Sequence, residues 1–177
     1  MTTVEYLRHL SQFAHNEVVE ALDGVTEKQA WAVLPQRGSD YLHSDGSIHG
    51  ITLHIASAKI MYASMSFRNT EIRLARLRRA YREVRAKLAA ALDYLGESQR
   101  YWLETWKSLT DDELTREVDH FSGRKWPVWQ AIRTMIHHDS WHGGQLVVLR
   151  YACPEFDQRP PSVAEDIRTH CGELPSW

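Results

Sequence analysis

The stretch Met135–Leu146, MIHHDSWHGGQL, holds the pattern from which the rest of the chain can be interpreted. His138 and His142 are four residues apart. On a helix they share one face with their Cβ atoms about 6 Å apart, so they can hold a single ion. Gln145 follows on the same face and places a hydrogen-bonding amide beside whatever the two imidazoles hold. His137 lies about 100° around the helix and is predicted to face another helix or water.

The spacing of the two histidines does not by itself establish a metal site. The chain contains ten histidines, and a pair of half-exposed polar residues on a core-facing helix would give the same pattern. Gly143 and Gly144 follow directly, inside a predicted helix where each glycine costs about 1 kcal/mol relative to alanine. We therefore expect the backbone to approach another element closely at these glycines.

Two long amphipathic helices are predicted in the first part of the chain. The first begins with Thr2 and Glu5 at capping-box spacing and ends near Gly24. The second covers about residues 47–67 and contains His54 on its apolar stripe, so this histidine should point into the core. A single histidine on an apolar face is more often a core residue with one hydrogen-bond partner than a ligand.

Two further long helices are predicted in the second part. Apolar residues keep a spacing of three and four from Leu74 to Leu95, and the pattern continues to Leu109, which indicates a long third helix. Residues 118–126 have no helical period and contain a Ser-Gly turn, which favours a small hairpin. Pro127 is suited to the first position of a fourth helix that ends near Cys153.

The composition is that of an ordinary globular protein. Its 177 residues are 43% apolar and 25% charged, with a formal net charge of −2, which argues against general nucleic-acid binding. No long apolar run is present, and Met1–Glu5 lacks the basic and apolar regions of a signal peptide. We expect one domain over residues 1–177, with its core at about 3–152 and a wrapping tail at 153–177, in the cytoplasm and without a membrane partner.

Cys153 and Cys171 are the only cysteines. Two thiols form neither a disulfide framework nor a zinc finger, so we interpret them as buried or incidental.

Four long helices predict an all-α bundle in which facing side chains can build a central site. His54 from the second helix and the pair His138 and His142 from the fourth would supply three neutral imidazoles. Three histidines leave a fourth position open for water or substrate, as in catalytic metal sites, whereas structural zinc sites are usually closed by four ligands.

Three segments together resemble the DinB/YfiT-like metalloenzyme family. LHIA around His54 resembles a segment of that family's second helix, and HHDSWHGGQL over residues 137–146 resembles its terminal histidine signature. WPVWQAI at residues 126–132 is similar to the segment that precedes the signature. Length, spacing and helix order agree over about residues 3–152.

The resemblance implies a DinB-like four-helix bundle with long crossover connections, often a homodimer, with a divalent metal on His54, His138 and His142. Zinc or nickel is the first expectation for the metal, and iron or manganese the second. Characterised members include transferases and isomerases that use a low-molecular-weight thiol such as bacillithiol, mycothiol or glutathione. The resemblance implies a small-molecule substrate and no DNA binding.

Three functional hypotheses follow. In the first, a metal-dependent transferase or isomerase activates a thiol, Gln145 orients a polar group of the substrate, and Asp139 acts from outside the ligand set.

In the second hypothesis, the protein hydrolyses a small ester or amide. His138–His142 has the spacing of the His-Glu-x-x-His helix of zinc proteases, but Asp139 is one methylene shorter than the usual glutamate base. In the third, the bundle binds metal without catalysis. A di-iron site is disfavoured because only Glu117–His120 fits its Glu-x-x-His motif.

Overall fold

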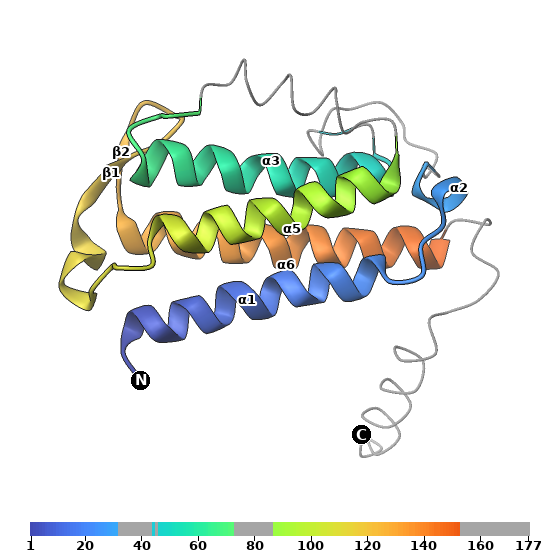
Figure 1. Cartoon of the computed structure of the whole chain (residues 1–177). Coiled ribbons are helices and arrows are strands. Elements are labelled where there is room, and N and C mark those ends of the chain that lie inside the picture. Colours follow the sequence, from blue (N-terminus) through green and yellow to red (C-terminus); the bar gives the residue numbers. More distant parts are fainter. Residues whose placement is uncertain (32–43, 45, 73–86, 153–177) are drawn as a thin grey trace, which may run out of the picture.

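The computed structural model describes residues 1–31, 44, 46–72 and 87–152. Within these residues, four long helices lie side by side (Figure 1): α1 (Thr3–Leu22), α3 (Ile48–Phe67), α5 (Leu88–Thr105) and α6 (Val128–Ala152). The shorter elements are α2 (Glu27–Ala30), the 3₁₀ turn η1 (Asp111–Thr115) and the strands β1 (Glu117–Asp119) and β2 (Lys125–Pro127). The predicted all-α bundle is confirmed.

The helices run in two pairs of opposite direction. In Figure 1, α1 and α6 run one way, and α3 and α5 run the other. Two helices that follow each other in the sequence can be parallel only if their connection crosses the length of the bundle, so the α3–α5 connection is of the crossover type. Helix α3 packs against both α5 and α6, and α1 packs against α6.

Local signals in the sequence set several helix starts. Thr2 accepts a hydrogen bond from the backbone of Glu5, whose carboxylate accepts one in return, and the same capping box is formed by Thr26 and Gln29 before α2. Ser47 accepts from the backbone N–H of Gly50 and caps α3. Each such cap satisfies backbone donors that have no partner within the helix.

The hairpin and its connection to α6 are close to the prediction. Strands β1 and β2 pair antiparallel, with Val118 opposite Trp126. Pro127 ends β2, and α6 begins one residue later at Val128, whose N–H donates to the Arg116 carbonyl at 2.9 Å. A long-range backbone hydrogen bond therefore fixes the start of the helix.

The prediction of one continuous third helix is wrong at Lys87. This residue has an extended backbone, with φ −146° and ψ 139°, and serves as the N-cap of α5. The Leu88 N–H donates instead to the carboxylate of Glu27, in the preceding short helix α2, at 2.8 Å. The helix also ends at Thr105, before Leu109. The part of the predicted seam at residues 74–86, and the predicted tail at 153–177 with both cysteines, lie outside the described residues.

Apolar burial gives the bundle two contiguous core clusters. One contains Ile51, Leu53 and Leu95, and the other is built around the fully buried indoles of Trp102 and Trp106 near the hairpin. Arg150 ties α6 to the end of α1, because its Nη1 donates to the carbonyls of Ala21 and Asp23 at 2.8 and 2.7 Å. No helix in the described ranges has the length and apolarity to cross a membrane.

The expected close approach at the two glycines is not found. A Cβ placed on Gly143 would meet the Val18 side chain at 3.6 Å, which is an ordinary contact, and one placed on Gly144 would meet nothing within 4 Å in the described chain. Gly144 is also exposed. Packing within the described chain therefore does not require glycine at either position.

Gly144→Ala should stabilise the fold. Alanine gains helix propensity at an exposed interior position, so the free energy of unfolding should rise by about 0.5–1 kcal/mol. Urea unfolding of metal-free protein measures this change. The free energy of unfolding of Ser140→Ala, at an exposed position one turn earlier in α6, is measured for comparison. A loss of stability in Gly144→Ala would show that another chain or segment needs the space.

Candidate metal centre

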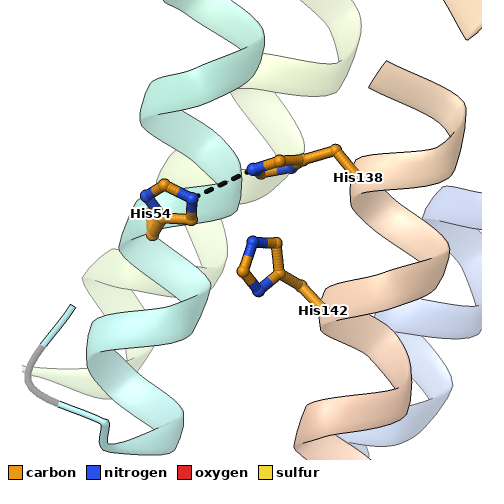
Figure 2. A group of neighbouring side chains, drawn as sticks. All are labelled: His54, His138 and His142. Carbon is orange, nitrogen blue, oxygen red and sulfur yellow. Dashed lines mark hydrogen bonds between the residues drawn. The ribbon is translucent and has the colours of Figure 1, made fainter. Parts of the chain in front are cut away.

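Three histidine rings from α3 and α6 meet at one point. Figure 2 shows His54 on one helix facing His138 and His142, one turn apart on the other. The ligand atoms that the three residues offer all lie within 4.8 Å of one another, and Nε2 of His54 and Nε2 of His138 are 3.0 Å apart. The structure thus brings together the three histidines that the sequence analysis selected.

Gln145 contacts the site through a histidine. Its Oε1 lies 2.6 Å from Nδ1 of His142. A carbonyl oxygen only accepts, so Nδ1 carries the proton, and Nε2 of His142 keeps its lone pair. The predicted neighbour of the site therefore fixes the tautomer and the orientation of His142, a role that outer partners of metal-bound histidines commonly have.

The protonation state of the rings suits a metal. Burial, followed by the positive charges of His142, His54, Lys59 and His137, lowers the pKa of His138 to about 2. His138 is therefore a neutral imidazole at physiological pH, the form that binds metals. Only one proton can lie between the facing Nε2 atoms of His54 and His138. Nδ1 of His138 is buried and has no hydrogen-bond partner among the described residues.

The three histidines could hold a divalent ion. Three nitrogen donors that converge across two helices are typical of the ligands of zinc and related ions. His54, His138 and His142 are the residues that would hold the ion.

Asp139, predicted to act near the ligands, lies in a separate buried network. Its Oδ2 is 2.7 Å from Nζ of Lys59 in α3, and both side chains are almost fully buried. The same Nζ is 3.0 Å from Nδ1 of His15 in α1, to which it donates. The ammonium group of Lys59 in α3 thus contacts side chains from both α6 and α1.

Burial dominates the electrostatics of this network. It raises the pKa of Asp139 to about 6 and lowers the pKa of Lys59, while the attraction between the two opposes both shifts. The 2.7 Å contact makes them an ion pair at pH 7 and above. Burial, followed by the positive charge of Lys59, lowers the pKa of His15 to about 3.

The sequence analysis missed Lys59 and His15. A signal for Lys59 was present, because it is the only lysine, arginine, aspartate or glutamate between Ile48 and Phe67. A single charge in an otherwise uncharged buried helix usually needs a partner on another helix. His15 had no comparable signal.

Three other histidines lie apart from the site. His49 stacks on Trp31 with ring centroids 4.3 Å apart, and His137 is exposed, as its place on the helix predicted. His120 stacks on Trp126 and bonds to the hydroxyls of Tyr62 and Ser122, so it anchors the hairpin.

Comparisons with known proteins agree with the fold. A family model described as DinB superfamily matches residues 2–146. A solved structure described as "Crystal structure of the conserved protein of locus from Enterococcus faecalis" is similar with a TM-score of 0.65 and 15% identity, over 84% of this chain and 95% of that one. At this identity the likeness concerns the fold alone. No curated protein matches the chain.

The low pKa of His15 predicts acid sensitivity. Between its unfolded value near 6.5 and its folded value near 3, only the unfolded chain takes up the proton, so stability falls as the pH falls. Below about pH 6, His15 should contribute a loss of about 1 kcal/mol per pH unit.

Urea unfolding of metal-free protein between pH 7 and 5 measures this contribution. His15→Gln, which can still accept from Lys59, should show a shallower dependence on pH than the wild type. The exposed His9→Gln on the same helix is the matched control. Equal slopes in His15→Gln and the wild type would contradict the assignment.

Proposed function

We propose that this chain, which belongs to the DinB superfamily, binds a divalent metal ion on His54, His138 and His142 and uses it in a reaction of a small molecule with a low-molecular-weight thiol. Zinc or nickel is the first candidate, and iron or manganese the second. The supporting observation is the meeting of three imidazoles from two helices within 4.8 Å. Three protein ligands leave room for a reactant, which favours catalysis over a purely structural role.

The residues of the chain have distinct tasks in this proposal. A divalent ion on three imidazoles supplies Lewis acidity, which lowers the pKa of a thiol and favours the nucleophilic thiolate. Gln145 holds His142 with Nε2 turned toward the other rings. Burial keeps His138 neutral and able to bind. In a transfer, the thiol would lose its proton and its sulfur would form a bond to an electrophilic carbon of the substrate. The bond from that carbon to a leaving group would break, and the leaving group would keep the electron pair and take up a proton.

The position of Asp139 disfavours hydrolysis in which this carboxylate is the general base. A general base has to be within hydrogen-bond reach of the water that it activates. The Asp139 side chain is buried, and its Oδ2 is bound to Lys59 at 2.7 Å. Hydrolysis of a peptidase type with Asp139 as the base therefore has less support than thiol transfer.

We also propose that the protein forms the homodimer expected from the resemblance. Trp141, Val148 and Tyr151 are exposed on the outer face of α6. Exposed apolar side chains gathered on one helix face are typical of association surfaces.

Metal content tests the proposed site. Tag-free wild-type protein should contain close to one metal ion per chain by inductively coupled plasma mass spectrometry. His54→Ala and His138→Ala should each lose most of it, because each removes one of only three ligands. His137→Ala, next to the site but exposed, is the matched control and should keep the metal.

A wild-type protein that stays empty after incubation with zinc, nickel, iron and manganese would contradict the metal site. If metal is bound but a panel of thiols and electrophiles shows no turnover, the metal site stands and the enzymatic part of the proposal is wrong.

Gln145→Leu should weaken metal binding without preventing it. The variant removes the acceptor that holds His142, and loss of such a partner typically costs 10–100-fold in affinity. Competition with a chromophoric chelator measures the dissociation constant, and Gln130→Leu on the same helix is the control. An unchanged affinity in Gln145→Leu would favour the earlier hypothesis that this amide acts on the substrate alone.

A further inference from the structure

A groove lies between the N-terminal half of α1 and the C-terminal half of α5. Its volume is about 610 Å³, which is within the range of about 300–1,000 Å³ of small-molecule sites. The three histidines of the metal centre come from α3 and α6 and do not line it. Among the described residues, the lining consists of Arg8 from α1 and of Arg100, Tyr101, Leu103, Glu104 and Lys107 from α5 and the turn after it.

The groove concentrates positive charge in a chain whose formal net charge is −2. Three cationic side chains and one carboxylate line it. The carboxylate, that of Glu104, pairs with Lys107, and the two side chains are 55% and 64% exposed. Exposed pairs of this kind are weak. The guanidinium groups of Arg8 and Arg100 have no opposing charge among the lining residues.

The guanidinium of Arg8 is held in position at the end of α5. Its Nη2 donates to the Trp106 carbonyl at 2.7 Å, and its Cζ lies 5.4 Å from the centroid of the Trp106 ring. A guanidinium has five N–H donors, and within the described ranges this bond is the one that Arg8 forms through its side chain. The remaining donors match a phosphate group, whose oxygens accept parallel N–H bonds from arginine.

Helix capping explains part of this arrangement. Cations near the C-terminus of a helix interact favourably with its last carbonyl groups, which accounts for Arg8 and Lys107. It does not account for Arg100, which is exposed and lies more than one turn before the end of α5 at Thr105. In the part of the chain that the structure describes, Arg100 forms no ion pair. Its charge is therefore available to a ligand.

The uncharged residues give the groove an apolar wall. The Tyr101 hydroxyl donates to the carboxylate of Glu71, which is not a lining residue, so the polar end of this side chain is already bound. The ring of Tyr101 and the side chain of Leu103 are both half-buried and line the groove. An apolar wall beside two guanidinium groups suits an organic anion that has a charged and an uncharged part.

We propose that the groove between α1 and α5 is a second binding site, which takes a small molecule with a phosphate group. Arg8 and Arg100 bind the phosphate oxygens, and Lys107 adds a positive charge. Tyr101 and Leu103 contact the organic part of the ligand. The site shares no residue with the metal centre, so it stands or fails independently of the proposed metal binding.

Phenyl phosphate is the probe, and isothermal titration calorimetry of the wild-type protein measures its dissociation constant. Arg8→Gln and Arg100→Gln should each weaken binding roughly tenfold, because each removes charge-assisted hydrogen bonds to the phosphate. Arg133→Gln removes the same charge from an exposed position on α6 and is the matched control, which should bind as the wild type does. Thermal unfolding of each variant reports on the fold.

Glu104→Gln should have the opposite effect. It removes the carboxylate of the groove and releases Lys107, so binding should become roughly threefold tighter. Arg100 and Glu104 are both exposed positions of the same helix. Damage to the fold cannot produce a gain in affinity at one of them and a loss at the other.

Two further ligands test the class of molecule. Inorganic phosphate should bind more weakly than phenyl phosphate, because it lacks the ring that contacts the apolar wall. Phthalate carries the same ring with two carboxylates and should also bind more weakly, because it lacks the phosphate oxygens that the guanidinium groups bind. Phthalate that binds as tightly as phenyl phosphate would contradict the phosphate class.

His54→Ala separates the groove from the metal centre. The variant lacks a candidate metal ligand and should bind phenyl phosphate as the wild type does. Binding that is lost in His54→Ala and kept in Arg100→Gln would place the anion at the metal centre and overturn the inference. The absence of binding to the wild type, or equal weakening in Arg133→Gln and Arg100→Gln, would overturn it as well.

Discussion

The constraint at the contact of α3 with α6 is that three imidazoles, two of them half-buried and one buried, meet between these helices. The nitrogens of His54, His138 and His142 lie within 4.8 Å of one another, and burial keeps His138 neutral. Each neutral imidazole has one N–H and one lone pair, and Nδ1 of His142 donates its proton to Gln145. The facing nitrogens of the three rings therefore hold more lone pairs than protons, and hydrogen bonds within the group cannot satisfy all of them. A divalent ion would engage one lone pair from each ring. The chemistry of the three rings is therefore that of a set of metal ligands. The surrounding bundle holds α3 and α6 in the positions that bring these ligands together.

The surroundings of the site show how this support is built. Gln145 fixes His142 from one turn further along α6, and the Lys59–Asp139 pair joins the two helices that carry the three histidines. His15 brings α1 into the same network. Elsewhere the bundle is stabilised by apolar burial and by single polar contacts, such as the hydrogen bond from Arg150 to the Ala21 carbonyl near the C-terminus of α1. Among the described residues, the buried lysine, arginine and carboxylate side chains are Lys59 and Asp139, which join α3 to α6, and Arg150, which ties α6 to the end of α1.

Much of this organisation could be predicted from the sequence, because it depends on local signals. The capping box at Thr2 and the turn-rich hairpin predicted where elements begin, and helical spacing together with a family resemblance placed His54 beside the histidine pair in α6. Long-range contacts could not be predicted. The break at Lys87 depends on a carboxylate in α2, and the partner of Asp139 is a lysine 80 positions earlier in the chain. The predicted close backbone approach at Gly143 and Gly144 was wrong for a related reason. The energetic cost of a glycine in a helix can be predicted from the sequence, but the atoms that surround it cannot.

The central claim is that three imidazoles from α3 and α6 bind one ion, and X-ray absorption spectroscopy of zinc-loaded protein tests it most directly. The account predicts a spectrum with nitrogen neighbours at about 2.0–2.1 Å and the outer-shell scattering of about three imidazoles per zinc, reduced by about one imidazole in a His54 variant that still binds some zinc. A spectrum without imidazole scattering, or one unchanged by substitution of His54, would place the metal elsewhere and contradict the account.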